Sequence, residues 1–125
     1  MKRRSFLFIA LATMMLTSLT VTQTVSAKPG DRMKYVVYSK INTKTWVTWY
    51  KTETFGIRKM IAGGWMEPGK SFTQELIEGN TYYVRGDVMN DQGKKIYDTT
   101  AKVEIGPGYP TSKTLMKGSD NYYWQ

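Results

Sequence analysis

The sequence predicts an all-β protein: a small antiparallel β-sandwich, immunoglobulin-like or similar, with about seven strands in a single domain. Apolar residues recur at every second position, in short runs enriched in β-branched and aromatic types. Turn-forming Gly, Pro and Asn residues separate these runs at roughly ten-residue spacing. No run after residue 27 shows a convincing helical period, so packing of sheet on sheet is the expected architecture.

The first 27 residues have the layout of a secretory signal peptide. Basic residues 2–4 precede an apolar run at 6–16, and residues 25–27 supply the small side chains of a cleavage site. The apolar run is too short to span about 30 Å of hydrocarbon, which disfavours a permanent membrane anchor. We therefore expect cleavage after Ala27 and a secreted protein, extracellular or periplasmic, that consists of residues 28–125 and has no transmembrane segment.

The expected mature domain is cationic and free of disulfides. Three of the chain's 18 Lys and Arg residues lie in the signal peptide, which leaves 15 against 10 Asp and Glu, a net charge of +5. This charge is spread over every run, so we expect weak, salt-dependent association with anionic envelope surfaces and no binding of nucleic acid. Because the chain has no Cys, burial of its four Trp and nine Tyr residues must supply much of the stability.

The expected strands follow one another with short connections. Pro68 and Gly69 form a turn, and the sequence Asn-Asp-Gln-Gly at 90–93 is typical of a hairpin loop. The run 71–77 fits a short helix as well as a strand, and the last two runs predict a terminal hairpin. In chain order, the runs are residues 33–41, 45–52, 57–66, 71–77, 81–89, 94–105, 113–116 and 121–124.

Strand alternation assigns the two faces of the clearest runs. In run 45–52, Val47 and Trp49 make the better core pair, which leaves Trp46 and Tyr50 on the other face. The core face of run 81–89 comprises Tyr82, Val84, Gly86 and Val88, and that of run 94–105 comprises Tyr97, Thr99, Ala101, Val103 and Ile105.

The composition argues against an enzyme. The chain has neither His nor Cys, which removes His-based nucleophile pairs, thiol chemistry and the usual zinc ligands. No Walker-type glycine loop is present, and the ten acidic residues are scattered rather than paired for glycoside hydrolysis. We expect no catalytic residue, no metal and no cofactor.

The tripeptide Arg85-Gly86-Asp87 is the one that integrin ligands display. Such recognition needs exposure at a loop tip, whereas here the tripeptide continues the alternation of run 81–89. We therefore expect Arg85 and Asp87 to flank an inward Gly86 within a strand.

A second suggestive string places Asp87, Asn90, Asp91 and Asp98 around a glycine, loosely like a calcium loop. Met89 stands where such a loop needs a ligand, and no Glu occupies the twelfth position. Asn, Asp and Gly are also what a hairpin loop requires, so we interpret this string as a turn.

The candidate site is an aromatic sheet face with charged neighbours. Partly exposed Trp and Tyr beside hydrogen-bonding groups are typical of sugar-binding faces and of hot spots in protein interfaces. The alternative is that these rings only pack the domain. The residues predicted to bind a ligand are Trp46, Tyr50, Tyr83, Arg85 and Asp87.

We expect a secreted, non-catalytic binding protein whose aromatic sheet face engages an envelope or extracellular glycan, or a protein. One alternative is a cationic antibacterial or membrane-active effector. The C-terminal sequence Asn-Tyr-Tyr-Trp-Gln loosely resembles secreted cationic bacteriocins with β-sandwich folds, over these five residues. Another alternative is an inhibitor or immunity partner of a secreted enzyme, which would plug an active site with a rigid edge or loop.

The signal-peptide interpretation predicts the N-terminus of the secreted protein. N-terminal sequencing of material recovered outside the cytoplasm should begin at Lys28. Recovery of only the full-length chain, embedded in a membrane, would contradict cleavage after Ala27.

Overall fold

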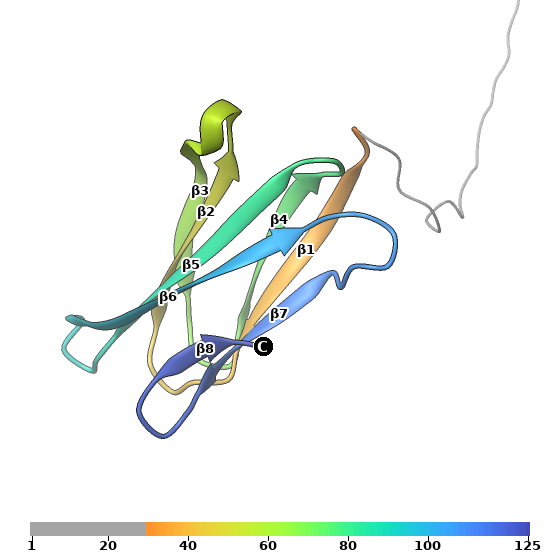
Figure 1. Cartoon of the computed structure of the whole chain (residues 1–125). Helices are drawn as coiled ribbons and strands as arrows, with labels where there is room; N and C mark the ends of the chain where they lie inside the picture. The colour runs from red at the N-terminus through yellow and green to blue at the C-terminus, as the bar shows by residue number, and fades with distance from the viewer. Residues whose placement is uncertain (1–29) are drawn as a thin grey trace, which may run out of the picture.

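The structure is a computed structural model, and it describes residues 30–125 (Figure 1). The expected signal peptide and its cleavage site lie outside the described residues. The strands are β1 (Arg32–Ser39), β2 (Thr45–Thr52), β3 (Arg58–Met66), β4 (Ser71–Ile77), β5 (Thr81–Met89), β6 (Lys95–Glu104), β7 (Ser112–Lys117) and β8 (Tyr122–Trp124). A short 3₁₀ turn, η3 (Thr54–Gly56), joins β2 to β3. Residues 30–125 contain no helix that is long and apolar enough to cross a membrane.

Two four-stranded sheets form a sandwich, which confirms the predicted fold class (Figure 1). The sheet orders are β4-β1-β7-β8 and β3-β2-β5-β6. All neighbours are antiparallel except β1 and β7, which pair in parallel with Val36 opposite Ser112. The sandwich is thus antiparallel except at this one pair. The connection from β6 to β7 carries the chain from one sheet to the other, and crossovers of this kind permit parallel neighbours.

The strand boundaries follow the alternation closely. Runs 45–52 and 81–89 coincide with β2 and β5. The ambiguous run 71–77 is a strand, β4, because it pairs along its whole length with β1 and turns the fully buried Leu76 toward the core. The terminal hairpin is present as β7 and β8, with Leu115 opposite Trp124.

The core lies between the sheets, and one aromatic contact joins their inner strands. Trp49 of β2 is fully buried, and its ring meets Tyr35 of β1 edge-on with centroids 5.6 Å apart. Burial raises the pKa of Tyr35 to about 12. The predicted core pair of Val47 and Trp49 is confirmed. The other core residues are Val37, Ile41, Met66, Leu76, Tyr82, Val84, Val88, Val103, Ile105 and Leu115.

The inner face of β6 is less buried than expected at its start. Tyr97 retains 36% exposure, and its ring contacts Tyr122 at 5.5 Å between centroids. β6 is an edge strand, and the three-residue β8 covers only part of it. The indole of Trp124 donates a hydrogen bond to the Thr99 carbonyl at 3.0 Å. This bond links β8 to the middle of β6. Tyr97 therefore belongs to the rim of the core.

Gly86 is buried on the inner face of β5, as predicted for the middle of the Arg-Gly-Asp tripeptide. A Cβ at this position would lie 3.0 Å from the Trp124 ring, so the close approach of β8 requires glycine. The tripeptide is thus part of a paired strand rather than a loop tip.

Trp49→Ala should lower the free energy of unfolding by about 3–5 kcal/mol, because it removes a fully buried ring and the contact between the sheets. Urea unfolding followed by far-UV circular dichroism measures the change. Tyr38→Ala is the control, since Tyr38 lies on the outer side of β1 with 46% exposure. Equal losses in the two variants would contradict the central position of Trp49.

Candidate functional site

The five predicted site residues share the outward face of the β3-β2-β5-β6 sheet. Their inward neighbours, including Val47, Trp49 and Val84, are buried in the core. Strand register places Trp46 opposite Asp87, Thr48 opposite Arg85 and Tyr50 opposite Tyr83. The expectation that Trp46 and Tyr50 lie on the same face is confirmed. We call this surface, formed by Trp46, Thr48, Tyr50, Gly63, Trp65, Tyr83, Arg85, Asp87, Asp98 and Thr100, the outer face.

A tryptophan pair lies at one end of the outer face. Trp46 pairs across strands with Trp65, and their rings meet edge-on with centroids 5.0 Å apart. The six-membered ring of Trp46 also lies against Gly63, where a Cβ would be only 3.1 Å from Cζ2. The absence of a side chain at Gly63 allows the indole of Trp46 to pack directly against the strand backbone. Thr48, which lies opposite Gly63 on β2, is 4% exposed. Trp46 is half-buried, whereas Trp65 is 47% exposed and offers the more open ring.

A network of four charges lies beside the tryptophan pair. Arg85 Nε donates to Asp87 Oδ1 at 3.0 Å, and its Nη2 lies 3.6 Å from Asp98 Oδ2. Lys95 Nζ lies 3.2 Å from Asp98 Oδ2 and 3.6 Å from Asp87 Oδ1. The two cations thus bridge the two carboxylates.

The two cations of the network offset the repulsion between two carboxylates that strand pairing brings together. Asp87 and Asp98 are directly opposite each other on β5 and β6, where like charges destabilise a sheet. The Asp87 side chain is only 15% exposed, so little solvent screens this repulsion. The hydrogen bond from Arg85 to Asp87 raises the pKa of Arg85 above its ordinary value, against the opposing effect of burial. The guanidinium is therefore held charged and in place.

Tyr83 and Tyr50 occupy the other end of the outer face, and they differ in what they offer. The guanidinium carbon of Arg58 lies 3.7 Å from the centroid of the Tyr83 ring, so a cation covers that ring. Tyr50 of β2 lies opposite Tyr83 on β5 and opposite Met60 on β3, and it is half-buried. At this end a ligand would meet the guanidinium of Arg58 rather than a bare Tyr83 ring.

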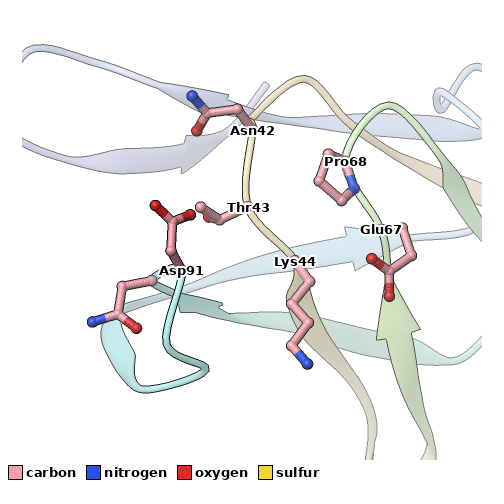
Figure 2. Close-up of a pocket in the computed structure, with 7 residues that line it drawn as sticks. Asn42, Thr43, Lys44, Glu67, Pro68 and Asp91 are labelled. Carbon is pink, nitrogen blue, oxygen red and sulfur yellow. The ribbon is translucent and has the colours of Figure 1, made fainter.

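A shallow polar pocket of about 220 Å³ lies at the end of the sheet next to the tryptophans (Figure 2). Three connections line it, and in Figure 2 the Asp91 side chain extends toward Thr43. Lys44 links the pocket to the outer face, because its Nζ lies 4.5 Å over the Trp65 ring. The lining residues are Asn42, Thr43, Lys44, Glu67, Pro68, Asn90 and Asp91.

The loop that loosely resembled a calcium site is a hairpin turn. Asn90 Oδ1 accepts hydrogen bonds from the backbone N–H groups of Gln92 and Lys94, both at 2.9 Å. An Asn side chain that mimics backbone in this way is an Asx turn. Among residues 30–125 no group of three or more His, Cys, Asp or Glu side chains is arranged to hold a metal ion.

The sequence interpretation left several residues of this region out of the predicted site. Trp65 and Arg58 come from β3, whose run carries apolar residues on both faces and so assigns neither face. Asp98 and Lys95 come from β6, for which the sequence predicted only the core-facing residues. Alternation places Trp65 on the face opposite Met66, but only the structure shows that Met66 is the buried one.

No family model matches this sequence, and no curated protein or solved structure is detectably similar to it. The chemistry of the site therefore has to be argued from its own residues.

Arg85→Gln should lower the free energy of unfolding by about 1–2 kcal/mol, because Asp87 then faces Asp98 with Lys95 as the only cation nearby. Adding Asp87→Asn should restore part of the loss. Thermal unfolding at low salt measures both variants.

The matched control is Arg32→Gln, because the ion pair of Arg32 with Glu75 is exposed, at 3.5 Å. Its removal should change stability by less than about 1 kcal/mol. If Asp87→Asn adds to the loss from Arg85→Gln, then the two side chains do not act as one network.

Proposed function

We propose that this protein is an exported, non-catalytic binding protein that engages an envelope or extracellular glycan through the outer face. The observation that carries the proposal is the Trp65 ring, which is 47% exposed with Lys44 Nζ over it, is held against Trp46 and lies near both the charge network and the polar pocket. The lack of His and Cys supports a binding role over a catalytic one.

The aromatic pair supplies the apolar part of such a site. A sugar ring presents one face of C–H groups, which packs against an aromatic ring, while its hydroxyls require hydrogen bonds. Trp65 keeps 47% exposure with Lys44 Nζ 4.5 Å from its ring centroid, so a sugar would pack on the ring area that Lys44 and Trp46 leave free. The edge-on packing with Trp46 holds the ring in place. A ring that is already ordered loses little conformational entropy when a ligand binds.

The polar part is supplied next to the tryptophans. Asp87 and Arg85 lie across the strands from them, and the pocket with Asn42, Asn90 and Asp91 lies beyond the adjoining strand ends. These groups provide donors and acceptors that match several hydroxyls of an extended glycan. A bound chain that crossed the strands from Trp65 would pass over Trp46 and meet Asp87, with the pocket beside its path, so the surface offers contacts to more than one sugar unit.

Trp65→Ala should weaken binding to an insoluble envelope glycan by about 2 kcal/mol, roughly thirtyfold, if Trp65 is the central contact. Its exposure predicts only a small loss of stability. Sedimentation of the purified protein with peptidoglycan and with other cell-wall polysaccharides measures the affinity.

Tyr38→Ala is the matched control, because Tyr38 is equally exposed (46%) but lies on the opposite sheet. Its affinity should equal that of the unmodified protein. If no polysaccharide binds, or if both variants bind as well as the unmodified protein, the outer face is not a glycan site. Capture of a culture protein that depends on Trp65 would instead assign the outer face to a protein partner.

A further inference from the structure

The tip of the β2–β3 hairpin exposes apolar side chains that nothing in residues 30–125 covers. Figure 1 shows this tip projecting beyond the neighbouring turns at one end of the sandwich. Phe55 is 96% exposed, and Ile57 and Met60 are 64% and 63% exposed. Apolar residues of this size normally find cover in a soluble domain, so their concentration at one projecting tip indicates an interaction.

The backbone of the tip holds Phe55 outward in an unfavourable conformation. Phe55 has φ 64° and ψ 23°, the left-handed region that a side chain with a Cβ seldom adopts. Two backbone hydrogen bonds close the turn around it: Glu53 N–H donates to the Ile57 carbonyl at 2.6 Å, and Gly56 N–H donates to the Glu53 carbonyl at 3.1 Å. A Gly or Asn would fit this position better, so fold stability alone does not explain a phenylalanine here.

Cations surround the base of the tip. Lys51 and Lys59 are directly opposite each other on β2 and β3, and Arg58 lies one residue away. Glu53 is the acid that pairs with this group among the described residues, and its carboxylate lies 3.9 Å from Lys51 Nζ. Among the described residues, neither Arg58 nor Lys59 forms an ion pair with a carboxylate. Like charges opposite each other destabilise the hairpin, and an external anionic surface would relieve that repulsion.

We propose that the β2–β3 tip docks into an anionic lipid surface, with Phe55 and Ile57 entering the interfacial region and the basic residues meeting lipid headgroups. Interfacial binding of this kind combines buried apolar area with attraction to anionic lipid. The observations that favour a bilayer are the convex, projecting shape and the cationic base. A second copy of the chain would bring like charges together, and a protein hot spot is usually the centre of a broad patch.

This inference can be tested apart from the proposed glycan site, because Phe55, Ile57 and Lys59 lie outside the outer face. Arg58 alone adjoins both surfaces, since its guanidinium covers the Tyr83 ring. The tip lies where β2 ends and β3 begins, whereas the polar pocket and the tryptophan pair lie toward the start of β2 and the end of β3. Variants at Trp65 and Phe55 therefore separate the two functions.

The test is co-sedimentation of the purified protein, produced from the full chain, with two kinds of vesicle. One contains equal parts phosphatidylglycerol and phosphatidylcholine, and the other contains phosphatidylcholine alone. The variant Phe55→Asn removes the ring and places a residue that tolerates positive φ, so its melting temperature should be unchanged or higher. The matched control is Tyr109→Asn, which removes an aromatic side chain with 51% exposure in the β6–β7 connection.

We expect binding to the anionic vesicles, with much weaker binding to phosphatidylcholine and a decline as salt rises. Phe55→Asn should weaken vesicle binding roughly tenfold or more. Lys59→Gln should weaken it about fivefold, as expected for loss of one charge near an anionic surface. Tyr109→Asn and Trp65→Ala should bind vesicles as the unmodified protein does, and Phe55→Asn should keep glycan binding.

Three results would overturn the proposal. One is absence of binding to the anionic vesicles at low salt, and another is equal binding by the unmodified protein and Phe55→Asn. The third is a change of oligomeric state on Phe55→Asn, measured by light scattering, because the tip would then be a contact between copies of this chain.

Discussion

The edge-on contact of Trp49 with Tyr35 is the interaction on which the rest of the structure depends. It joins β2 to β1, the inner strands of the two sheets, in a domain that has no disulfide to hold the sheets together. Because alternate residues of a strand point to opposite faces, an inward Trp49 forces Trp46 and Tyr50 outward. The position of the candidate site is thus a consequence of how the core is packed.

Much of the fold could be predicted because apolar and polar residues alternate along the strands that supply most of the core. β2 and β5 were predicted with the correct ends. β5 buries every second residue along its length, and β2 buries Thr45, Val47 and Trp49 in the same way, with Thr48 buried as well. The parallel pairing of β1 with β7 could not be predicted, because it depends on where the connection at 105–111 crosses between sheets. No local pattern of residues indicates that the chain passes from one sheet to the other at this connection. Tyr97 was overestimated as a core residue for a similar reason, since its burial depends on the length of a strand in the other sheet.

The candidate site could be predicted within single strands but not across them. Trp46 and Tyr50 follow from alternation in β2, whereas the neighbour Trp65 depends on the register of β2 against β3. That register contains a bulge between Trp49 and Tyr50, and the hairpin turns at Phe55 in a left-handed conformation. Bulges and turns of this kind shift a strand by one residue, which exchanges its two faces.

The two proposed surfaces belong to opposite ends of one hairpin, and this arrangement lets them act together. Trp46 lies six residues before the end of β2, about 20 Å from the start of the tip at the usual rise of a strand. If the tip enters a lipid surface, the strands of the sheet stand away from it, and the tryptophan pair faces the aqueous side. Occupation of the tip would then leave the Trp65 end of the outer face accessible, because the proposed lipid contacts do not include Trp46, Trp65 or Asp87. Attachment at the tip would hold the outer face at a high effective concentration near envelope polymers, so a weak glycan contact would be sufficient for retention.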